Sequence, residues 1–408
     1  MNACIIIAFY TTMQLSKRID SVIESQTLAM TKLARSLKEQ GKDIISLSIG
    51  EPDFNTPENI CYEASNAMKR GETHYTPVMG TLAFRKAIQE KLQRENNLSY
   101  STDEIIVSNG AKQSIFNAVM ALVNPGDEVI LPAPFWVSYP AMVNYAGGVC
   151  VEIPTSIETN YKVSAELLES YITPKTKLII FSSPCNPSGS VMSEVEIKAW
   201  AEVLERHPHV FVISDEIYEK IVYNTKPFSI GSIPSMKSRV ATVNGLAKGY
   251  AMTGWRIGYM AGPEILIKAC EKFQGLISSG ANSIAQAAGI EALIGDQSPV
   301  EDMRLQFEKR RNLMAEKLAE IPGLKVNNPE GAFYHFPDVT AFIGKSYENG
   351  TIKNADDLCM YLLETAWVAL VSGDAFGAKN CIRLSYATSE EQIVEAVSRI
   401  HQALMRLN

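Results

Sequence analysis

The chain has 408 residues, of which 46% are hydrophobic and 20% are charged, and its formal net charge is −7. This length allows two or three domains with a large core, and the acidic balance disfavours a nucleic-acid-binding surface. Seven scattered cysteines without a Cys-x-x-Cys spacing argue against a disulfide framework or a structural zinc site, and they suit a reducing cytoplasm.

The N-terminus begins with a short apolar run at residues 3–10, within a segment that we expect to be a disordered extension over residues 1–15. The run lacks a positive flank and is too short for a signal peptide or a membrane span. No later run approaches the roughly 20 apolar residues that a span needs, so no membrane partner is expected. Residues 28–40 then predict a helix that ends at Gly41.

The middle of the chain alternates short apolar runs with longer amphipathic ones. Residues 111–123 form the first predicted helix of this middle part. The predicted strands are residues 104–108, 128–131, 149–153, 178–181, 210–214, 240–243 and 257–260. Because these runs are continuous rather than alternating, they predict strands that are buried on both faces. The fold class is therefore α/β, with a mostly parallel sheet sandwiched by helices.

The flanking segments have a different pattern. Residues 300–319 predict a charged amphipathic helix, and strand-like pieces follow at residues 332–336, 369–371 and 382–385. We expect a large α/β domain over residues 60–290. A smaller α+β domain would combine residues 16–59 with residues 291–408.

Polar and aromatic residues follow the predicted strands, at the edge where open parallel sheets bind ligands. The segments that follow them are residues 109–113, 132–136, 183–189, 215–218 and 244–259. The two histidines of His207-Pro-His209 are interpreted as a solvated turn, and no metal-ligand motif is present. The clustering predicts one binding site without a metal.

These pieces suit a charged heteroaromatic ring that carries a phosphate. Gly110 and Ala111 open a helix whose N-terminus attracts an anion, and Arg256 could add a bidentate contact. Asp215 could hold a protonated ring nitrogen, although it could equally be a helix N-cap. Lys248 lies among Gly and Ala, which leave room for a flat cofactor.

The motifs of competing nucleotide and hydrolase sites are absent: the sequence has no GxGxxG, GxxxxGK[ST] or GxSxG. Instead, an ordered set of seven motifs closely resembles the class I aminotransferases, which are pyridoxal-phosphate enzymes of fold type I. The set is GEPDF (50–54), HYTP (74–77), NGAKQ (109–113), SPCNPSG (183–189), SDEIY (214–218), AKGYAMTGWRIG (247–258) and RLSYA (383–387). The chain looks most like the bacterial and plant branch that uses aspartate and, in some members, prephenate.

The resemblance implies roles for individual residues. Lys248 would bind pyridoxal 5'-phosphate covalently and move the substrate α-proton, and Asp215 would hold the ring nitrogen. Trp136 would stack on the ring and contact the substrate. The other implied cofactor contacts are Asn186 and Tyr218 at the ring oxygen, and Gly110, Ala111, Lys112 and Arg256 at the phosphate. Tyr75 would reach the phosphate in a neighbouring subunit, so a homodimer with a shared active site is implied.

The substrate contacts that the resemblance implies are Gly50, which allows close approach, and Arg383, which would clamp the α-carboxylate. Asn186, Lys112 and Thr27 would contact the substrate as well, with Lys112 near a distal carboxylate and Thr27 matching a residue associated with prephenate use. Ile23-Glu24 opposes prephenate use, because a carboxylate there would repel a second substrate carboxylate. Many family members carry serine where this chain has Gly245 and Ala247, so at least one phosphate donor is missing.

The expected function is ping-pong amino transfer from L-aspartate to 2-oxoglutarate through pyridoxamine phosphate, with conversion of prephenate to arogenate as a possible second activity. Two enzyme alternatives remain on the same scaffold: an aromatic or broad-specificity class I aminotransferase, and a pyridoxal-phosphate-dependent lyase. A non-catalytic cofactor-binding regulator is a further alternative. Neither a nucleic-acid nor a membrane partner is expected, and the predicted location is the cytoplasm.

Overall fold

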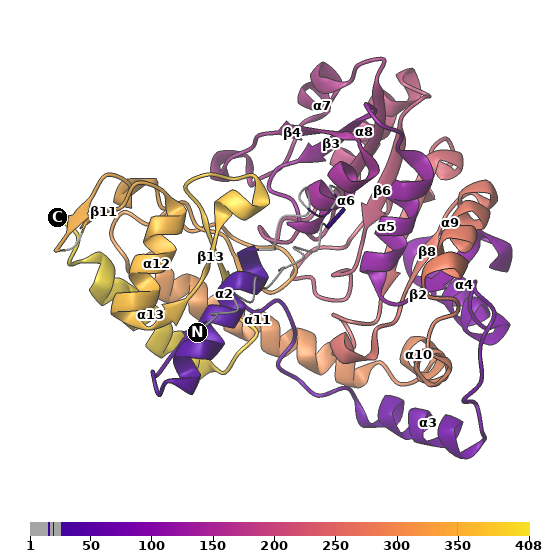
Figure 1. Cartoon of the computed structure of the whole chain (residues 1–408), viewed down its shortest axis with the longest axis horizontal. Helices are drawn as coiled ribbons and strands as arrows, with labels where there is room; N and C mark the ends of the chain where they lie inside the picture. Colours follow the sequence, from indigo (N-terminus) through magenta and orange to yellow (C-terminus); the bar gives the residue numbers. More distant parts are fainter. Residues whose placement is uncertain (1–14, 17–18, 20–25, 349) are drawn as a thin grey trace, which may run out of the picture.

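The computed structural model of the chain describes residues 15–16, 19, 26–348 and 350–408. The expected N-terminal extension therefore falls almost wholly outside the described residues. A large α/β part holds the central sheet, and a smaller part contains the C-terminal segment together with α2 (Gln26–Glu39) (Figure 1). Among the helices that the structure describes, none combines the length and the apolar character that crossing a bilayer requires.

The central sheet has seven strands in the order β2-β8-β7-β6-β5-β3-β4. Their bounds are β2 Ile105–Ser108, β3 Glu128–Pro132, β4 Val149–Ile153, β5 Thr176–Ser182, β6 Phe211–Asp215, β7 Val240–Gly245 and β8 Gly258–Ala261. Neighbouring strands from β7 to β4 are parallel, whereas β8 is antiparallel to both β2 and β7. The mostly parallel sheet is thus confirmed. The apolar pattern could not predict that β8 is antiparallel to its neighbours, because such a pattern carries no information on strand direction.

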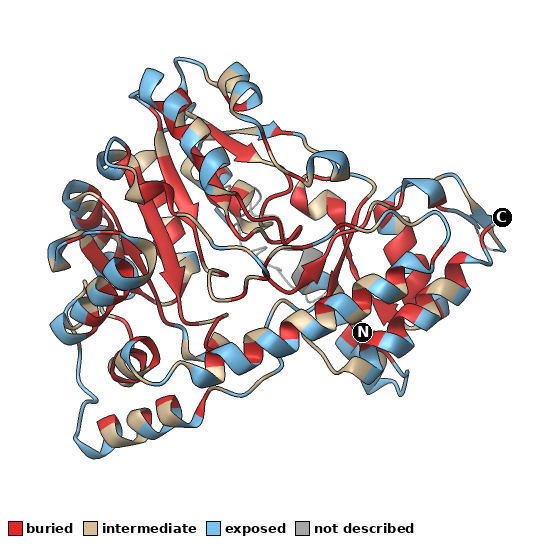
Figure 2. Cartoon of the chain, turned by 180° about the vertical axis from the view of Figure 1, so that it is seen from behind, coloured by how far each residue is buried: buried red, intermediate tan, exposed pale blue. Residues whose placement is uncertain are grey.

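Helices cover both faces of this sheet, and Figure 2 shows its strands as buried. Alternate residues of β2 enter different apolar clusters: Ile106 packs with α5 (Ala111–Leu122), α6 (Ser138–Ala146) and α9 (Glu264–Ile277), and Val107 with α4 (Leu82–Asn96) and α10 (Ser283–Ile294). At the other end of the sheet, the second face is covered by α7 (Ala165–Tyr171) and α8 (Glu194–Arg206). The predicted burial on both faces is therefore confirmed for the inner strands. It is wrong for the edge strand β4, where Val149 and Glu152 are exposed and Cys150 and Val151 are half-buried, because no further strand covers that edge.

The smaller part contains a three-stranded antiparallel sheet, β13-β14-β9, and two short strand pairs. The elements outside the large sheet are β1 Ile45–Ser46, α3 Glu58–Lys69, α11 Ser298–Ala319, β9 Tyr334–His335, β10 Ser346–Tyr347, β11 Gly350–Thr351, α12 Ala355–Ala366, β12 Val368–Ala369, β13 Val371–Ser372, β14 Ile382–Ser385 and α13 Glu390–Leu404. Helix α3 packs on α10, beside the large sheet. The domain boundaries expected at residues 60 and 290 remain a prediction.

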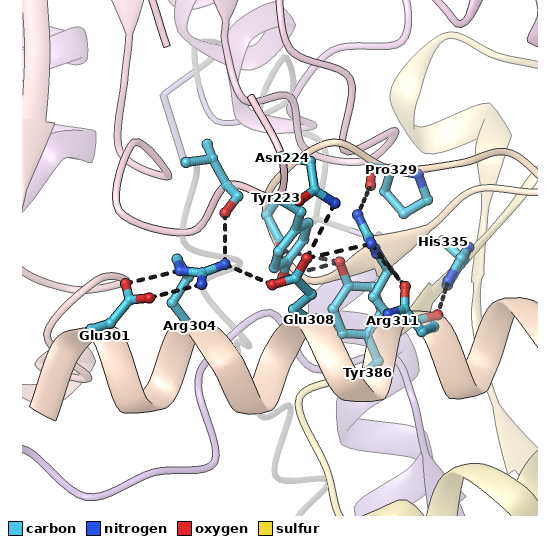
Figure 3. Close-up of polar contacts among 12 residues, drawn as sticks. Tyr223, Asn224, Glu301, Arg304, Glu308, Arg311, Pro329, His335 and Tyr386 are labelled. Atoms are coloured by element: carbon cyan, nitrogen blue, oxygen red, sulfur yellow. Dashed lines mark hydrogen bonds and ion pairs between the residues drawn. The ribbon is translucent and has the colours of Figure 1, made fainter. Parts of the chain in front are cut away.

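Helix α11 runs from the large part into the smaller one (Figure 1) and carries a row of polar contacts (Figure 3). Arg304 bridges Glu301 and Glu308 at 2.8 and 2.9 Å. One turn further, the backbone oxygen of Arg311 lies 3.1 Å from Nε2 of the buried His335. Because His335 belongs to β9, this contact anchors β9 against α11 and fixes the face that its neighbour Tyr334 presents.

Candidate active site

Lys248 lies three residues beyond β7, at the carboxyl edge of the sheet. Its ammonium donates a hydrogen bond to the backbone oxygen of Gly50. Burial lowers the pKa of Lys248 to about 8, an effect that the Glu51 carboxylate opposes and that the Arg383 and Arg256 cations strengthen. A sizeable fraction of this lysine is therefore free amine near neutral pH, which is the form that attacks a carbonyl carbon.

Asp215 is the last residue of β6 and is only 4% exposed. The hydroxyl of Tyr139 donates to Oδ2 at 2.7 Å, and the backbone N–H of Ile217 donates to Oδ1 at 3.3 Å. Burial raises the pKa of Asp215 to about 6, although both hydrogen bonds and the Lys248 charge counteract this rise. The carboxylate is thus held in place for a cationic partner, while the N-cap alternative accounts only for the contact to Ile217.

The N-terminus of α5 and Arg256 approach each other closely. Gly110 has φ +88°, and a Cβ there would lie 2.7 Å from Nη2 of Arg256. Gly258 leaves similar space, because its Cβ would overlap the backbone nitrogen of Ala111 at 2.3 Å. The glycines therefore allow a guanidinium and a helix N-terminus to meet, which is an arrangement suited to phosphate.

Trp136 and Lys112 lie beside this N-terminus. The Lys112 ammonium is 4.8 Å from the centre of the Trp136 ring, and burial together with the Arg256 charge lowers the pKa of Lys112. The edge of Tyr139 meets the indole of Trp136 at 5.5 Å between ring centres, with an 85° interplanar angle. Trp136 packs against the apolar core but is only half-buried, so part of its side chain remains accessible to a ligand.

Arg383, on β14, is 2% exposed yet forms no ion pair with any carboxylate of the described residues. Its Nη1 donates to Oδ1 of Asn186 at 2.9 Å, and its Nη2 donates to the backbone oxygen of Ser48 at 2.7 Å. Its Nε finds no hydrogen-bond partner in the described part of the chain. A buried guanidinium with an unpaired N–H is costly unless a ligand satisfies it, and a carboxylate has the matching geometry.

Tyr218 lies between these groups, and its hydroxyl is 2.9 Å from the hydroxyl of Tyr334. The backbone of Gly50 lies close to the Tyr334 hydroxyl and to Arg383. A Cβ on Gly50 would lie 3.0 Å from the Tyr334 hydroxyl and 3.9 Å from Nη2 of Arg383. The structure therefore brings together most of the residues expected at the site from the sequence: Gly50, Gly110, Ala111, Lys112, Trp136, Asn186, Asp215, Tyr218, Lys248, Arg256 and Arg383.

Two candidates are not among the residues of this cluster, for different reasons. Tyr75 lies in the connection between α3 and α4, is 100% exposed, and forms no hydrogen bond or ring contact with the other described site residues. Thr27 lies in α2, but its side chain is outside the described part of the chain, as are Ile23 and Glu24.

The substitution of glycine for serine at position 245 has a structural counterpart. A Cβ on Gly245 would lie 3.0 Å from Cα of Gly258 and 3.1 Å from the backbone oxygen of Ile257. These contacts are tight, so a serine at this position would require β7 and β8 to move apart locally. Position 245 thus lacks the serine hydroxyl, and β7 and β8 pack closely together at this position.

Three contributors to the site were not predicted. Tyr139 follows Trp136 by three residues, so helical spacing offered a weak signal for its position. Tyr334 and Ser48 gave no local signal, because their contacts to Tyr218 and Arg383 join distant parts of the chain.

Comparisons with known proteins agree with this geometry. The family model for aminotransferase class I and II matches residues 42–400. A bifunctional aspartate aminotransferase and glutamate/aspartate-prephenate aminotransferase of Petunia hybrida is 47% identical over 96% of this chain and 83% of its own length. A probable aspartate/prephenate aminotransferase of Rhizobium leguminosarum bv. phaseoli is 47% identical over 95% of this chain and 98% of its own length.

Among solved structures, the crystal structure of the aspartate aminotransferase from Rhizobium meliloti superposes with a TM-score of 0.94. The two chains are 46% identical, and the match covers 97% of this chain and 100% of that one. The family match, the relatives and the shared fold lead to one conclusion: this chain belongs to the class I and II aminotransferases.

Proposed function

We propose that the protein is an aspartate aminotransferase that passes the amino group of L-aspartate to 2-oxoglutarate, and that it uses prephenate as an additional amino-group acceptor. The names of its relatives support both activities. The observation that carries the proposal is Lys248: a largely buried lysine with a pKa of about 8, close to the Arg383 and Arg256 cations, which suit anionic ligands.

Family membership implies pyridoxal phosphate, and the residues present fit it. The glycine-lined approach of Arg256 to Gly110 suits a phosphate, and the buried carboxyl of Asp215 suits a ring nitrogen. In this proposal, the phosphate end is held by Gly110, Ala111, Lys112 and Arg256, the ring face by Trp136, the ring nitrogen by Asp215, the ring oxygen by Asn186 and Tyr218, and the covalent bond by Lys248. When bound, the cofactor would supply an electron sink for the pair released at the substrate Cα and a carrier for the amino group between the two half-reactions.

The chain's own residues then bind the substrate and move protons. Arg383 pairs its unpartnered Nε and one Nη with the α-carboxylate, and the missing Cβ of Gly50 leaves room for close approach. Lys248, as free amine, accepts the proton from the substrate Cα and returns it in the reverse direction. Asp215 stays ionised because the Tyr139 hydroxyl stabilises its charge.

Lys112 supports a dicarboxylic substrate, because its ammonium lies over Trp136 rather than in an ion pair with a described carboxylate. We assign it a role in holding the distal carboxylate of aspartate, 2-oxoglutarate or prephenate. The role of Thr27 in prephenate use remains a proposal that rests on the family pattern alone.

We further propose a homodimer in which Tyr75 of each copy serves the neighbouring copy's phosphate site, and its complete exposure supports this arrangement. A cytoplasmic location is supported by the described cysteines, all of which are free thiols.

The test is the visible absorption spectrum of the protein loaded with pyridoxal phosphate, recorded before and after L-aspartate is added alone. The expected result is loss of the visible band with release of about one oxaloacetate per bound cofactor, because ping-pong transfer completes half of the reaction without an acceptor. Neither change should occur in Lys248→Ala, which lacks the amine that accepts the substrate proton. A band that persists would remove aspartate as donor, and absence of any band in the wild type would remove the cofactor. Arogenate formed from prephenate and L-aspartate would establish the second activity.

A further inference from the structure

Tyr334 contacts three residues of the candidate site, although the proposed function assigns it no role. Its side chain is completely buried, and its hydroxyl lies 2.9 Å from that of Tyr218. The guanidinium carbon of Arg383 lies 4.5 Å from the centre of its ring. The same hydroxyl would lie 3.0 Å from a Cβ on Gly50. One side chain thus joins the proposed ring-oxygen contact to the proposed carboxylate clamp.

The strand pairing explains how Tyr334 reaches both groups. Strand β9 is antiparallel to β14, with Tyr334 opposite Ser385. Arg383 lies two residues before Ser385 and therefore on the same face of the sheet, as a diagonal neighbour of Tyr334. His335 points to the opposite face, where the backbone of Arg311 holds it. The orientation of Tyr334 is therefore set by the sheet and by α11.

The two hydroxyl groups have one proton each, which restricts how they can be arranged. A tyrosine hydroxyl donates one hydrogen bond and also accepts. If Tyr218 donates its proton to a cofactor oxygen, the proton between the two tyrosines must come from Tyr334. Burial raises the pKa of both tyrosines, so both hydroxyl groups keep their protons near neutral pH.

We propose that Tyr334 is a positioning residue: its hydroxyl donates to Tyr218 and so directs the Tyr218 proton toward the ring oxygen of the cofactor, while its ring holds the Arg383 guanidinium for the substrate carboxylate. This inference rests on the proposed function. Simple core packing is the competing explanation, and it requires only an aromatic ring at this position. Under that explanation, a phenylalanine at position 334 would serve as well as the tyrosine.

The hydroxyl is tested with Tyr334→Phe, loaded with pyridoxal phosphate, by titrating the visible absorption with pH. The chromophore is the protein-bound pyridoxal phosphate, and the variant is expected to raise its pKa by about 0.5 to 1 unit. This shift is the equivalent of one net hydrogen bond. The sign follows because a hydrogen bond to the ring oxygen favours the deprotonated chromophore. The matched control is Tyr361→Phe, which loses an equally buried hydroxyl that donates to Ala403 at 2.8 Å, and its chromophore is expected to titrate as in the wild type.

A double-mutant cycle then asks whether Tyr334 acts through Tyr218. In a Tyr218→Phe background, Tyr334→Phe should produce no further shift. An unchanged pKa in the single variant, or an equal shift in both backgrounds, would overturn the proposal. If Tyr334→Phe does not fold, the double variant Tyr218→Phe/Tyr334→Phe still tests the inference, because it leaves neither hydroxyl without its partner. A chromophore pKa in the double variant above that in Tyr218→Phe contradicts the inference, and an equal pKa supports it.

The ring is tested with Tyr334→Leu, which removes the face below Arg383. The KM for L-aspartate should rise by about 3- to 30-fold, as expected for a buried cation–π contact, while Tyr334→Phe should keep the wild-type KM. A KM that does not change in Tyr334→Leu would refute the part assigned to the ring. A wild type that shows no titrating visible band would instead refute the proposed function, so the two failures are distinguishable.

Discussion

Removing the Tyr139 hydroxyl should change the protonation state of Asp215. The Tyr139 hydroxyl donates to Oδ2 at 2.7 Å inside the protein, where burial already raises the pKa of Asp215 to about 6. A hydrogen bond to a charged group contributes about 1.5 to 3 kcal/mol. At 1.36 kcal/mol per pKa unit, its loss corresponds to a rise of roughly one to two units. In Tyr139→Phe apoprotein, the carboxyl should therefore titrate at roughly pH 7 to 8.

The assay is carbon-13 NMR of the aspartate carboxyl groups in the apoprotein across pH 4 to 9, with Asp215→Asn used to assign the resonance. Phenylalanine keeps the ring that packs edge-on against Trp136, so the packing is conserved. The control is Tyr161→Phe, whose equally buried hydroxyl donates at 2.7 Å to the backbone of Phe336. It should leave Asp215 titrating near pH 6. If Asp215 also titrates near pH 6 in Tyr139→Phe, the hydrogen bond does not stabilise the carboxylate and the reasoning fails.

Three further predictions concern the cations of the protein. Only the unprotonated amine of Lys248 reacts, so the rate at which the apoprotein binds pyridoxal phosphate should rise with pH through about 8 and then level off. A rate, measured by stopped flow, that is flat across this pH range would contradict the lowered pKa of Lys248. Arg383→Lys, which keeps the charge but loses the fork, should raise the KM for L-aspartate by about 30-fold, or roughly 2 kcal/mol, and steady-state kinetics with an unchanged KM would remove the clamp. Lys91 forms a buried ion pair with Glu219. Lys91→Met should lower the free energy of unfolding in urea by about 3 to 5 kcal/mol, because it leaves the Glu219 carboxylate buried without a cation, with the Asn96 amide still donating to it at 2.7 Å. The double variant Lys91→Met/Glu219→Gln should regain part of this loss, and a double variant that is less stable than Lys91→Met would show that the buried charge is not the cause.

The central sheet could be predicted because its strands are continuous apolar runs. The predicted strands at residues 149–153 and 128–131 match β4 and β3 within one residue. The smaller part was harder to predict: residues 332–336 were expected to form a strand, but the structure pairs only Tyr334–His335. Strands of two residues are too short for an apolar period to develop, so their bounds depend on the neighbours with which they pair.

The sequence by itself was enough to predict that these polar side chains gather at one site, because parallel strands place their carboxyl ends at one edge of the sheet. Lys248, Asp215 and Asn186 each follow a predictable strand, and the structure places all three at the site. Only the tertiary structure decided how these groups are held. The hydrogen bonds from Tyr139 to Asp215 and between Tyr218 and Tyr334 join residues that are 76 and 116 positions apart. Such contacts produce no periodicity or spacing along the chain, since they arise only when separate elements fold against one another.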